Sequence, residues 1–222
     1  MGSNTSQMVG ISQGNAADRV SVVPVVYGKG LNPDPPALTD KFVRGDFVKM
    51  IVDPKHQNAL FVFNENMEDA ASKSNGGGTA KIRQYVQAPP KNGGRAIGMP
   101  TGYWPGETGG FTTLDVFEAD CTEWGYNSIL RVLRDNPQIE FVYYACKSVE
   151  KLDLLGTDTF TVDPRALQVI SLMLQSVPHD LATAPWSQAQ LDDERDRLIQ
   201  RAKAKKPPSA PPAEVRPRSL SY

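Results

Sequence analysis

The sequence predicts an α/β fold: a single compact mixed sheet with helices on both faces, a flexible N-terminal arm and a disordered C-terminal tail. Segments rich in apolar, β-branched residues alternate with segments whose apolar residues recur at helical spacing. A length of 222 residues suits one domain with a sizeable core, and 40% hydrophobic and 22% charged residues are ordinary for a globular protein. We therefore expect an arm over residues 1–18, an α/β core domain over 19–200 and a basic tail rich in Pro, Ala and Ser over 201–222.

In the first half of the domain, the sequence predicts three strands and two helices. Strands are expected over residues 20–27, 60–63 and 95–99, and the wholly apolar run over 60–63 is typical of a central strand buried on both faces. Prolines and glycines exclude regular structure from residues 28–36. Thr39 is a suitable N-cap for a helix that ends near Val52, and residues 79–86 form a second helix. The apolar residues that recur at helical spacing in the first of these helices are Phe42, Val43, Phe47, Met50 and Ile51.

In the second half, the sequence predicts two strands and three helices. Thr112 or Thr113 is expected to cap the longest helix, which runs to about Arg134. A strong strand over residues 139–145 and a short edge strand over 158–162 follow. Asp163-Pro164 is a cap and first residue for a helix to about Ser176, and Ser187 caps the last helix. The long apolar face around Ile129, Leu130 and Leu133, together with Trp124 and Trp186, suits either a core or a dimer interface.

A glycine-rich loop between the second and third strands is the one place that looks built for a charged ligand. Gly76, Gly77 and Gly78 lead directly into Thr79 and a predicted helix. The first N–H groups of a helix lack intrahelical acceptors and point outward, which suits a phosphate or another anion.

Several standard chemistries are excluded or weakly supported. The chain has no Gly-Lys-Ser/Thr of a P-loop, no G-x-G-x-x-G and no G-x-S-x-G. Two histidines and the two distant cysteines, Cys121 and Cys146, predict neither a metal site nor a disulfide framework, and no cofactor is expected. Acid–base catalysis would rest on Glu65, Asp115 or Asp158, but such carboxylates usually cap helices, so an enzyme is not favoured. Residues 1–15 do not read as a signal peptide, and no apolar run is long enough to cross a membrane.

Charge is unevenly distributed along the chain. Residues 199–222 hold six cations against Glu214 alone, a net charge of +5, while the whole chain carries −1 and residues 1–198 therefore carry −6. An acidic body with a basic tail suits either contact with a polyanion or a solubilising tail. Cations beside RNA phosphates would give salt-dependent affinity without sequence preference, and aromatic residues of the loop over 102–110 would stack on exposed bases. Of Tyr103, Trp104 and Phe111, we expect Tyr103 to be the exposed one and the other two to close a small core.

Three motifs resemble a small domain family of phages and bacteria that reads F-G-D-N, G-x-G-G-Q-A, a following arginine, and A-I-G-x-P-T-K. Here they are Phe63-Asn64-Glu65-Asn66, then Gly77-Gly78-Thr79-Ala80 with Arg83, then Ala96-Ile97-Gly98-Met99-Pro100-Thr101, and Leu155-Gly156-Thr157 is similar to a late loop of that family. The chain departs from the family at Asn64, Glu65, Thr79 and Gly102. The resemblance, over residues 58–176, implies a macrodomain-like fold that binds or hydrolyses an ADP-ribose-type nucleotide. The nucleotide-binding residues would be Asn66, Gly76, Gly77, Gly78, Thr101, Gly156 and Thr157.

The layout of arm, core and basic Pro/Ala/Ser tail resembles the proline-alanine-serine-rich proteins of polymycoviruses. That resemblance implies a non-enzymatic, coat-like protein that associates with viral double-stranded RNA, self-associates and acts in the host cytoplasm or with the virus, away from membranes. We favour this function over the nucleotide-binding one, and a plain interaction module with a proline-rich docking tail is the third possibility. The expected RNA contacts are Lys73, Lys81, Arg83, Arg95, Tyr103, Arg201, Lys203, Lys205, Lys206, Arg216 and Arg218.

Overall fold

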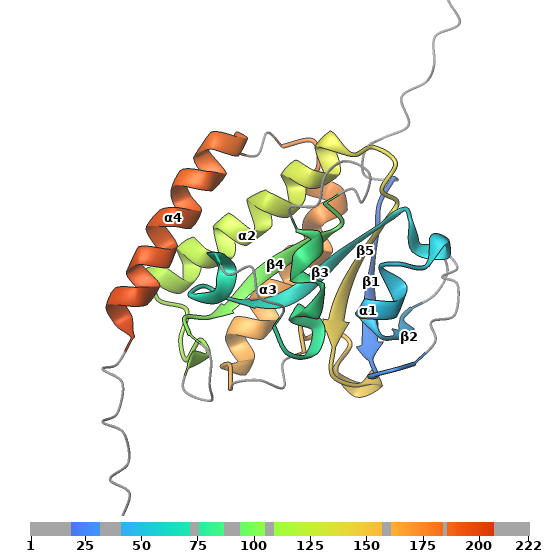
Figure 1. Ribbon diagram of the computed structural model, residues 1–222, viewed down its shortest axis with the longest axis horizontal. Helices are drawn as coiled ribbons and strands as arrows, with labels where there is room; N and C mark the ends of the chain where they lie inside the picture. The colour runs from blue at the N-terminus through green and yellow to red at the C-terminus, as the bar shows by residue number, and fades with distance from the viewer. Residues whose placement is uncertain are drawn as a thin grey trace, which may run out of the picture.

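Five parallel strands form one sheet in the order β2-β1-β5-β3-β4 in a computed structural model of the protein (Figure 1). The structure describes residues 19–31, 41–71, 76–86, 94–104, 109–156, 161–183 and 186–206. The strands are β1 (Ser21–Tyr27), β2 (Val43–Gly45), β3 (Ala59–Asn66), β4 (Ala96–Gly102) and β5 (Phe141–Cys146). A mixed sheet was expected, but every pairing of these strands is parallel. The predicted arm, Thr39 and most of the predicted edge strand over 158–162 lie outside the described residues.

Helices cover both faces of the sheet, as the sequence predicts. The longer elements are α1 (Phe47–Met50), the 3₁₀ helix η4 (Gly78–Tyr85), α2 (Val116–Asp135), α3 (Pro164–Asp180) and α4 (Gln188–Lys205), with short 3₁₀ turns η2 (Pro54–His56), η3 (Asp69–Ala71) and η6 (Val149–Lys151). Helices α2 and α3 pack on one face and α1 and η4 on the other. Helix α4 lies along the outer side of α2 (Figure 1). None of the described helices is long and apolar enough to cross a bilayer.

Alternate residues of β3 point to opposite faces and build two separate core clusters. Leu60 and Val62 pack against α2 and α3, and Phe61 and Phe63 pack against α1 and η4. All four side chains are fully buried, which confirms a central strand covered on both sides. The apolar face of α2 around Ile129, Leu130 and Leu133 belongs to the first cluster, so it is core and not a dimer interface.

A third apolar cluster joins α4 to the rest of the domain. Leu198, Ile199 and Ala202 of α4 are buried against residues of α2, of α3 and of the loop after β4, including Phe117 and Phe111. The helix continues to Lys205. The first residues of the predicted disordered tail, from Arg201 onward, are therefore helical and part of the folded domain, because the buried stripe of α4 extends to Ala202.

Two helix starts differ from the prediction, each because a side chain caps a helix at another residue. Phe42 and Val43 suit a helix by spacing, but Val43 pairs with Val25 in the sheet, and Asp46 caps α1 by accepting a hydrogen bond from Val48 N at 2.9 Å. Asp115, and not Thr112 or Thr113, caps α2 in a reciprocal capping box with Glu118. Asp163 and Ser187 cap α3 and α4 as predicted.

Two cysteines and one histidine of the core have structural roles. Cys121 and Cys146 are free and buried, and burial raises the pKa of Cys146 to about 12, so neither is poised as a nucleophile. His56 is buried beside Tyr143, whose hydroxyl lies 3.3 Å from its Nδ1, and burial lowers the pKa of its imidazole. His56 is therefore a neutral core residue at physiological pH.

Candidate functional site

The sheet splits at the carboxyl end of β3. The ladder between β3 and β5 ends at the pair Val62 and Tyr144, after which β3 pairs only with β4 while β5 pairs with β1. The chain leaves β3 toward η4 on one face and leaves β5 toward α3 on the other, and the two strands diverge in Figure 1. In open parallel sheets, ligands bind at the carboxyl edge where neighbouring connections leave to opposite faces.

Two asparagine amides at this split have buried polar atoms without hydrogen-bond partners among the described residues. Asn66 is 4% exposed, and its Oδ1 accepts hydrogen bonds from the backbone N–H groups of Glu68 at 3.0 Å and Asp69 at 3.3 Å, which turns the chain after β3. Its Nδ2 has no acceptor in the described part of the chain. Both polar atoms of the Asn64 amide are also shielded from solvent without a partner there. Buried polar groups are nearly always satisfied in folded proteins, so these amide atoms mark the split as a candidate ligand position.

Between these amides, Glu65 forms a buried ion pair with Arg83 of η4. Nε of Arg83 donates to Oε2 at 2.9 Å and Nη2 donates to Oε1 at 2.6 Å, with the two residues 3% and 8% exposed. Burial raises the pKa of Glu65, opposed by the hydrogen bonds and charge of Arg83. A bidentate contact at these distances is that of two ionised groups. Arg83, which the sequence suggested as an RNA contact, instead fixes η4 to the end of β3.

Glycines leave room for this ion pair. A Cβ on Gly98 of β4 would lie 2.6 Å from Cβ of Glu65, so any side chain at this position would clash with Glu65 and only glycine fits. Gly76 lies against Arg83, since a Cβ there would be 3.2 Å from Nη2. Gly77 is the N-cap of η4 and supplies no side-chain cap, so the first N–H groups of that helix have no side-chain acceptor there.

The structure brings most of the predicted nucleotide-binding residues to one edge of the sheet. Asn66 and Gly76 lie against the Glu65–Arg83 pair, and Gly77 and Gly78 follow at the start of η4. Thr101 is fully buried with its hydroxyl 3.5 Å from the carbonyl oxygen of Glu65, which is a structural position. Gly156 donates its N–H to the carbonyl oxygen of Ala145 at 2.8 Å, at the end of β5 and across the split. Thr157 lies outside the described residues.

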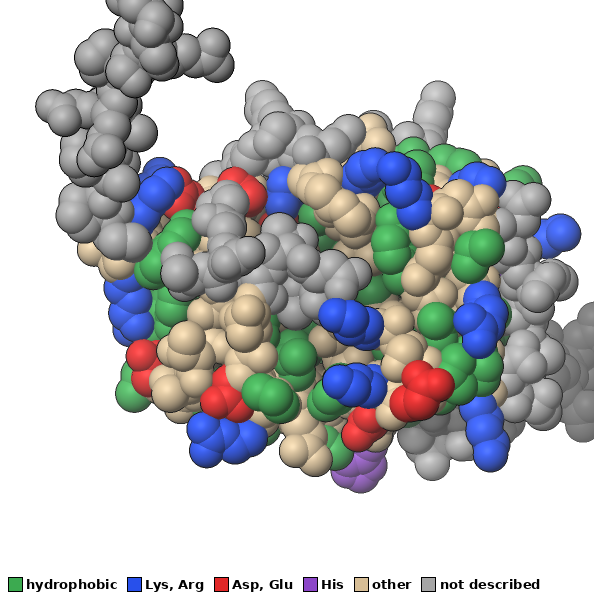
Figure 2. All heavy atoms as spheres, turned by 90° about the horizontal axis from the view of Figure 1, so that it is seen from below, with side chains coloured by type: hydrophobic (Ala, Val, Ile, Leu, Met, Phe, Trp, Pro, Cys, Tyr) green, Lys and Arg blue, Asp and Glu red, His purple; other side chains and the backbone are tan. Residues whose placement is uncertain are grey.

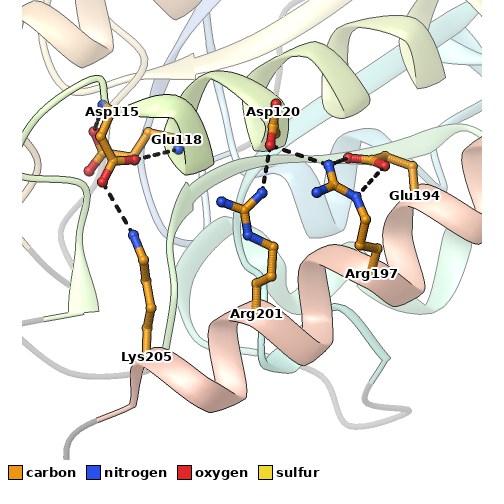
Figure 3. A network of polar contacts seen from close by, with 7 residues as sticks. All are labelled: Asp115, Glu118, Asp120, Glu194, Arg197, Arg201 and Lys205. Atoms are coloured by element: carbon orange, nitrogen blue, oxygen red, sulfur yellow. Dashed lines mark hydrogen bonds and ion pairs between the residues drawn. The ribbon is translucent and has the colours of Figure 1, made fainter.

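Most of the predicted RNA-binding cations of α4 are paired within the protein. Figure 3 shows Arg201 reaching Asp120 of α2, at 2.6 Å, and Lys205 reaching Asp115, at 3.2 Å. Lys206 pairs with Glu68 at 2.7 Å. The ammonium group of Lys205 also lies 4.8 Å from the ring centroid of Tyr103. These cations therefore bind α4 to the domain.

Two other expected RNA contacts also have structural roles. Tyr103 is only 7% exposed and stacks on Phe117 at a centroid distance of 4.5 Å, so the prediction that it is exposed was wrong. Tyr103 is buried because Lys205 and Phe117 cover its ring. Arg95 donates to the backbone carbonyl oxygens of His56, at 2.8 Å, and Ile51, and so ties the segment before β3 to β4.

The remaining predicted RNA contacts are two exposed lysines and three residues that the structure does not describe. Lys81 lies exposed on η4 and Lys203 lies exposed on α4, whereas Lys73, Arg216 and Arg218 are outside the described residues. Viewed from below, Lys and Arg side chains are scattered among acidic and hydrophobic ones and form no single basic patch on the part of that face that is described (Figure 2).

Sequence reasoning named Asn66 as a nucleotide-binding residue but missed the Glu65–Arg83 pair and the unsatisfied amide of Asn64. A carboxylate at a strand end followed by an arginine in a glycine-led helix is the signal that could have indicated the pair. The described residues contain no cluster of His, Cys, Asp and Glu that could hold a metal ion. Comparisons of the chain with models of known protein families, with curated proteins and with solved structures found no match.

Proposed function

We propose that the protein binds a phosphate-bearing nucleotide of the ADP-ribose type across the carboxyl edge of the sheet, at the split between β3 and β5. The observation that carries the proposal is the set of buried amide atoms of Asn64 and Asn66 that have no partner among the described residues, beside the glycine-led start of η4. Amide groups suit the polar edges of a base or ribose, and the uncapped N–H groups of η4 suit a phosphate. The macrodomain-like resemblance of the same segment supports this choice of ligand.

Thermal unfolding in the presence of ADP-ribose, NAD and free nucleotides tests the proposal. A ligand at about 100 times its dissociation constant stabilises the folded state by about 2.7 kcal/mol. Gly77→Ala is the sharp variant, because a Cβ there meets no described atom within 4 Å and the backbone, with φ of −78°, accommodates alanine. Its unliganded melting temperature is expected to equal or exceed that of the parent chain, while ligand stabilisation is lost.

Asn66→Asp is also expected to weaken binding, because it removes the Nδ2 donor and adds a negative charge to the binding site of an anionic ligand. Asn127→Asp, the same exchange on α2 away from the split, is the matched control and should leave the response unchanged. No stabilisation of the parent chain by any of these nucleotides contradicts the proposal.

A coat-like association with RNA is the second candidate, supported by the exposed Lys81 and Lys203 and by the basic C-terminal sequence. Because α4 extends to Lys205, the informative truncation retains residues 1–206 and removes only two arginines against Glu214. In fluorescence anisotropy with double-stranded RNA, full-length protein should bind more tightly at low salt. The truncation should lower the salt slope by about 1–2, because each phosphate that the protein no longer neutralises changes that slope by about 0.7–0.9. Absence of RNA binding by the full chain at low salt contradicts this candidate.

A further inference from the structure

A pocket of about 130 Å³ lies at the outer edge of β4, between the end of η4, helix α2 and the start of α4. In Figure 1, β4 is the sheet strand beside α2, with α4 beyond. Apolar walls come from Val86, Ile97, Trp124, Val132 and Leu191. The indole N–H of Trp124 donates to the backbone carbonyl oxygen of Leu191 at 2.9 Å, which fixes the ring in the wall. The volume is close to that of an engineered cavity of about 150 Å³ that binds benzene.

Two arginines of the pocket differ in their partners. Nε of Arg131 is buried without a hydrogen bond of good geometry, but it lies 2.9 Å from Oδ2 of Asp135, whose charge compensates it. The side chain of Arg195 is 26% exposed, and the nearest carboxylate oxygen among the described residues, on Asp196, is 3.9 Å from its Nε, beyond hydrogen-bond distance. Its buried Nε has no hydrogen-bond acceptor among the described residues. An N–H group that is buried without an acceptor is costly, so this Nε favours a ligand that brings an anionic acceptor.

The backbone of Gly98 supplies a second donor at the pocket. Phe61 N donates to Arg95 O at 2.8 Å, and Phe61 is in register with Ala96. In a parallel ladder, every second residue of a strand bonds to the same neighbouring strand, so counting in twos from Arg95 gives the residues of β4 that bond to β3. Gly98 is not one of them, and its N–H therefore points away from β3 toward the open edge. Pro100, which has no N–H, takes the next outward position, as is usual for a proline in an edge strand. Gly98 also lines the pocket.

We infer that this pocket binds a small apolar carboxylic acid, of about the size of benzoate, with its carboxylate at Arg195 and the N–H of Gly98. The apolar body contacts Trp124, Val132 and Leu191, and the carboxylate provides the acceptor that Nε of Arg195 lacks among the described residues. This site is separate from the proposed nucleotide site, which lies at the carboxyl edge around Asn66.

Titration of the ¹⁵N-labelled full chain with benzoate, followed by NMR, tests the inference. We expect saturable shifts of the Gly98 amide and Trp124 indole signals, at least tenfold weaker binding of the uncharged isostere benzamide, and at least tenfold weaker benzoate binding by Arg195→Gln. Lys203→Gln removes the same charge from an exposed position of the same helix and should bind benzoate within twofold of the parent chain.

Equal binding of benzoate and benzamide to the parent chain overturns the inference, and so does unchanged binding in Arg195→Gln. The comparison of the two ligands uses the unaltered protein, so it decides the question even where the variant does not fold. Absence of any saturable shift up to 10 mM benzoate, a concentration on the order of ten times a 1 mM dissociation constant, also overturns it.

Discussion

Replacement of Arg83 by methionine is expected to lower the free energy of unfolding by about 3–5 kcal/mol, because it leaves Glu65 buried without its partner. Both nitrogens that Arg83 directs at Glu65 donate to the carboxylate, and both side chains are buried at the end of β3. The effect is measured by urea unfolding of the parent chain and the variant under identical conditions.

The pH dependence of this loss identifies its cause. Burial already raises the pKa of Glu65, and removal of Arg83 takes away the hydrogen bonds and the positive charge that lower it. In the variant the folded state then binds a proton that the unfolded state has released, so stability falls as pH rises above the unfolded pKa of Glu65. Arg83→Met should therefore be less destabilised at pH 5 than at pH 8.

Two further variants separate a buried ion pair from a general loss of packing. Arg165→Met removes an exposed arginine that pairs with Asp163, and it should cost no more than about 1 kcal/mol. Glu65→Leu combined with Arg83→Met should recover much of the stability lost in the single variant, because no unpaired charge is then buried. A loss below about 1 kcal/mol in Arg83→Met, with no dependence on pH, would contradict this account.

Local signals predicted the elements of the fold well where they were unambiguous. The apolar run over residues 60–63 is a buried central strand, and Asp163-Pro164 and Ser187 begin the helices that they were expected to begin. The spacing of apolar residues around Val43 fits a helix as well as a strand, and its pairing with Val25 decides between them. That pairing is not local, so the sequence alone could not resolve it.

The sequence predicted that the residues of the candidate site would meet, but not which contacts they make. The glycine loop and Asn66 do meet at the carboxyl edge of the sheet, yet Arg83 is a partner of Glu65 and not a free cation. Charge can be read from a sequence, but its neutralisation depends on residues that are far apart. Lys206 pairs with Glu68, 138 positions away, and Arg201 with Asp120, 81 positions away. The sequence therefore suggested that the cations of the basic tail were unpaired, whereas most of those up to Lys206 form ion pairs.

Leu198→Ala is expected to lower the free energy of unfolding by about 2–5 kcal/mol, whereas Arg201→Gln should lower it by no more than about 1 kcal/mol. Leu198 is fully buried between α4 and the rest of the domain, while Arg201 shares Asp120 with Arg197 on a partly exposed surface. Burial of apolar surface thus holds α4 in place, and the ion pairs of Figure 3 fix its alignment along α2.

Urea unfolding of both variants at 0.1 M and 0.5 M salt distinguishes these contributions, because salt screens exposed charges and leaves apolar contacts intact. The difference between Leu198→Ala and the parent chain should be the same at both salt concentrations. The small effect of Arg201→Gln should shrink further at 0.5 M. If Arg201→Gln cost as much as Leu198→Ala, electrostatics would hold α4, and a polyanion such as RNA could then compete for its cations and release the helix. With burial dominant, those cations stay paired, and the proposed RNA contacts are limited to Lys81, Lys203 and the residues beyond Lys206.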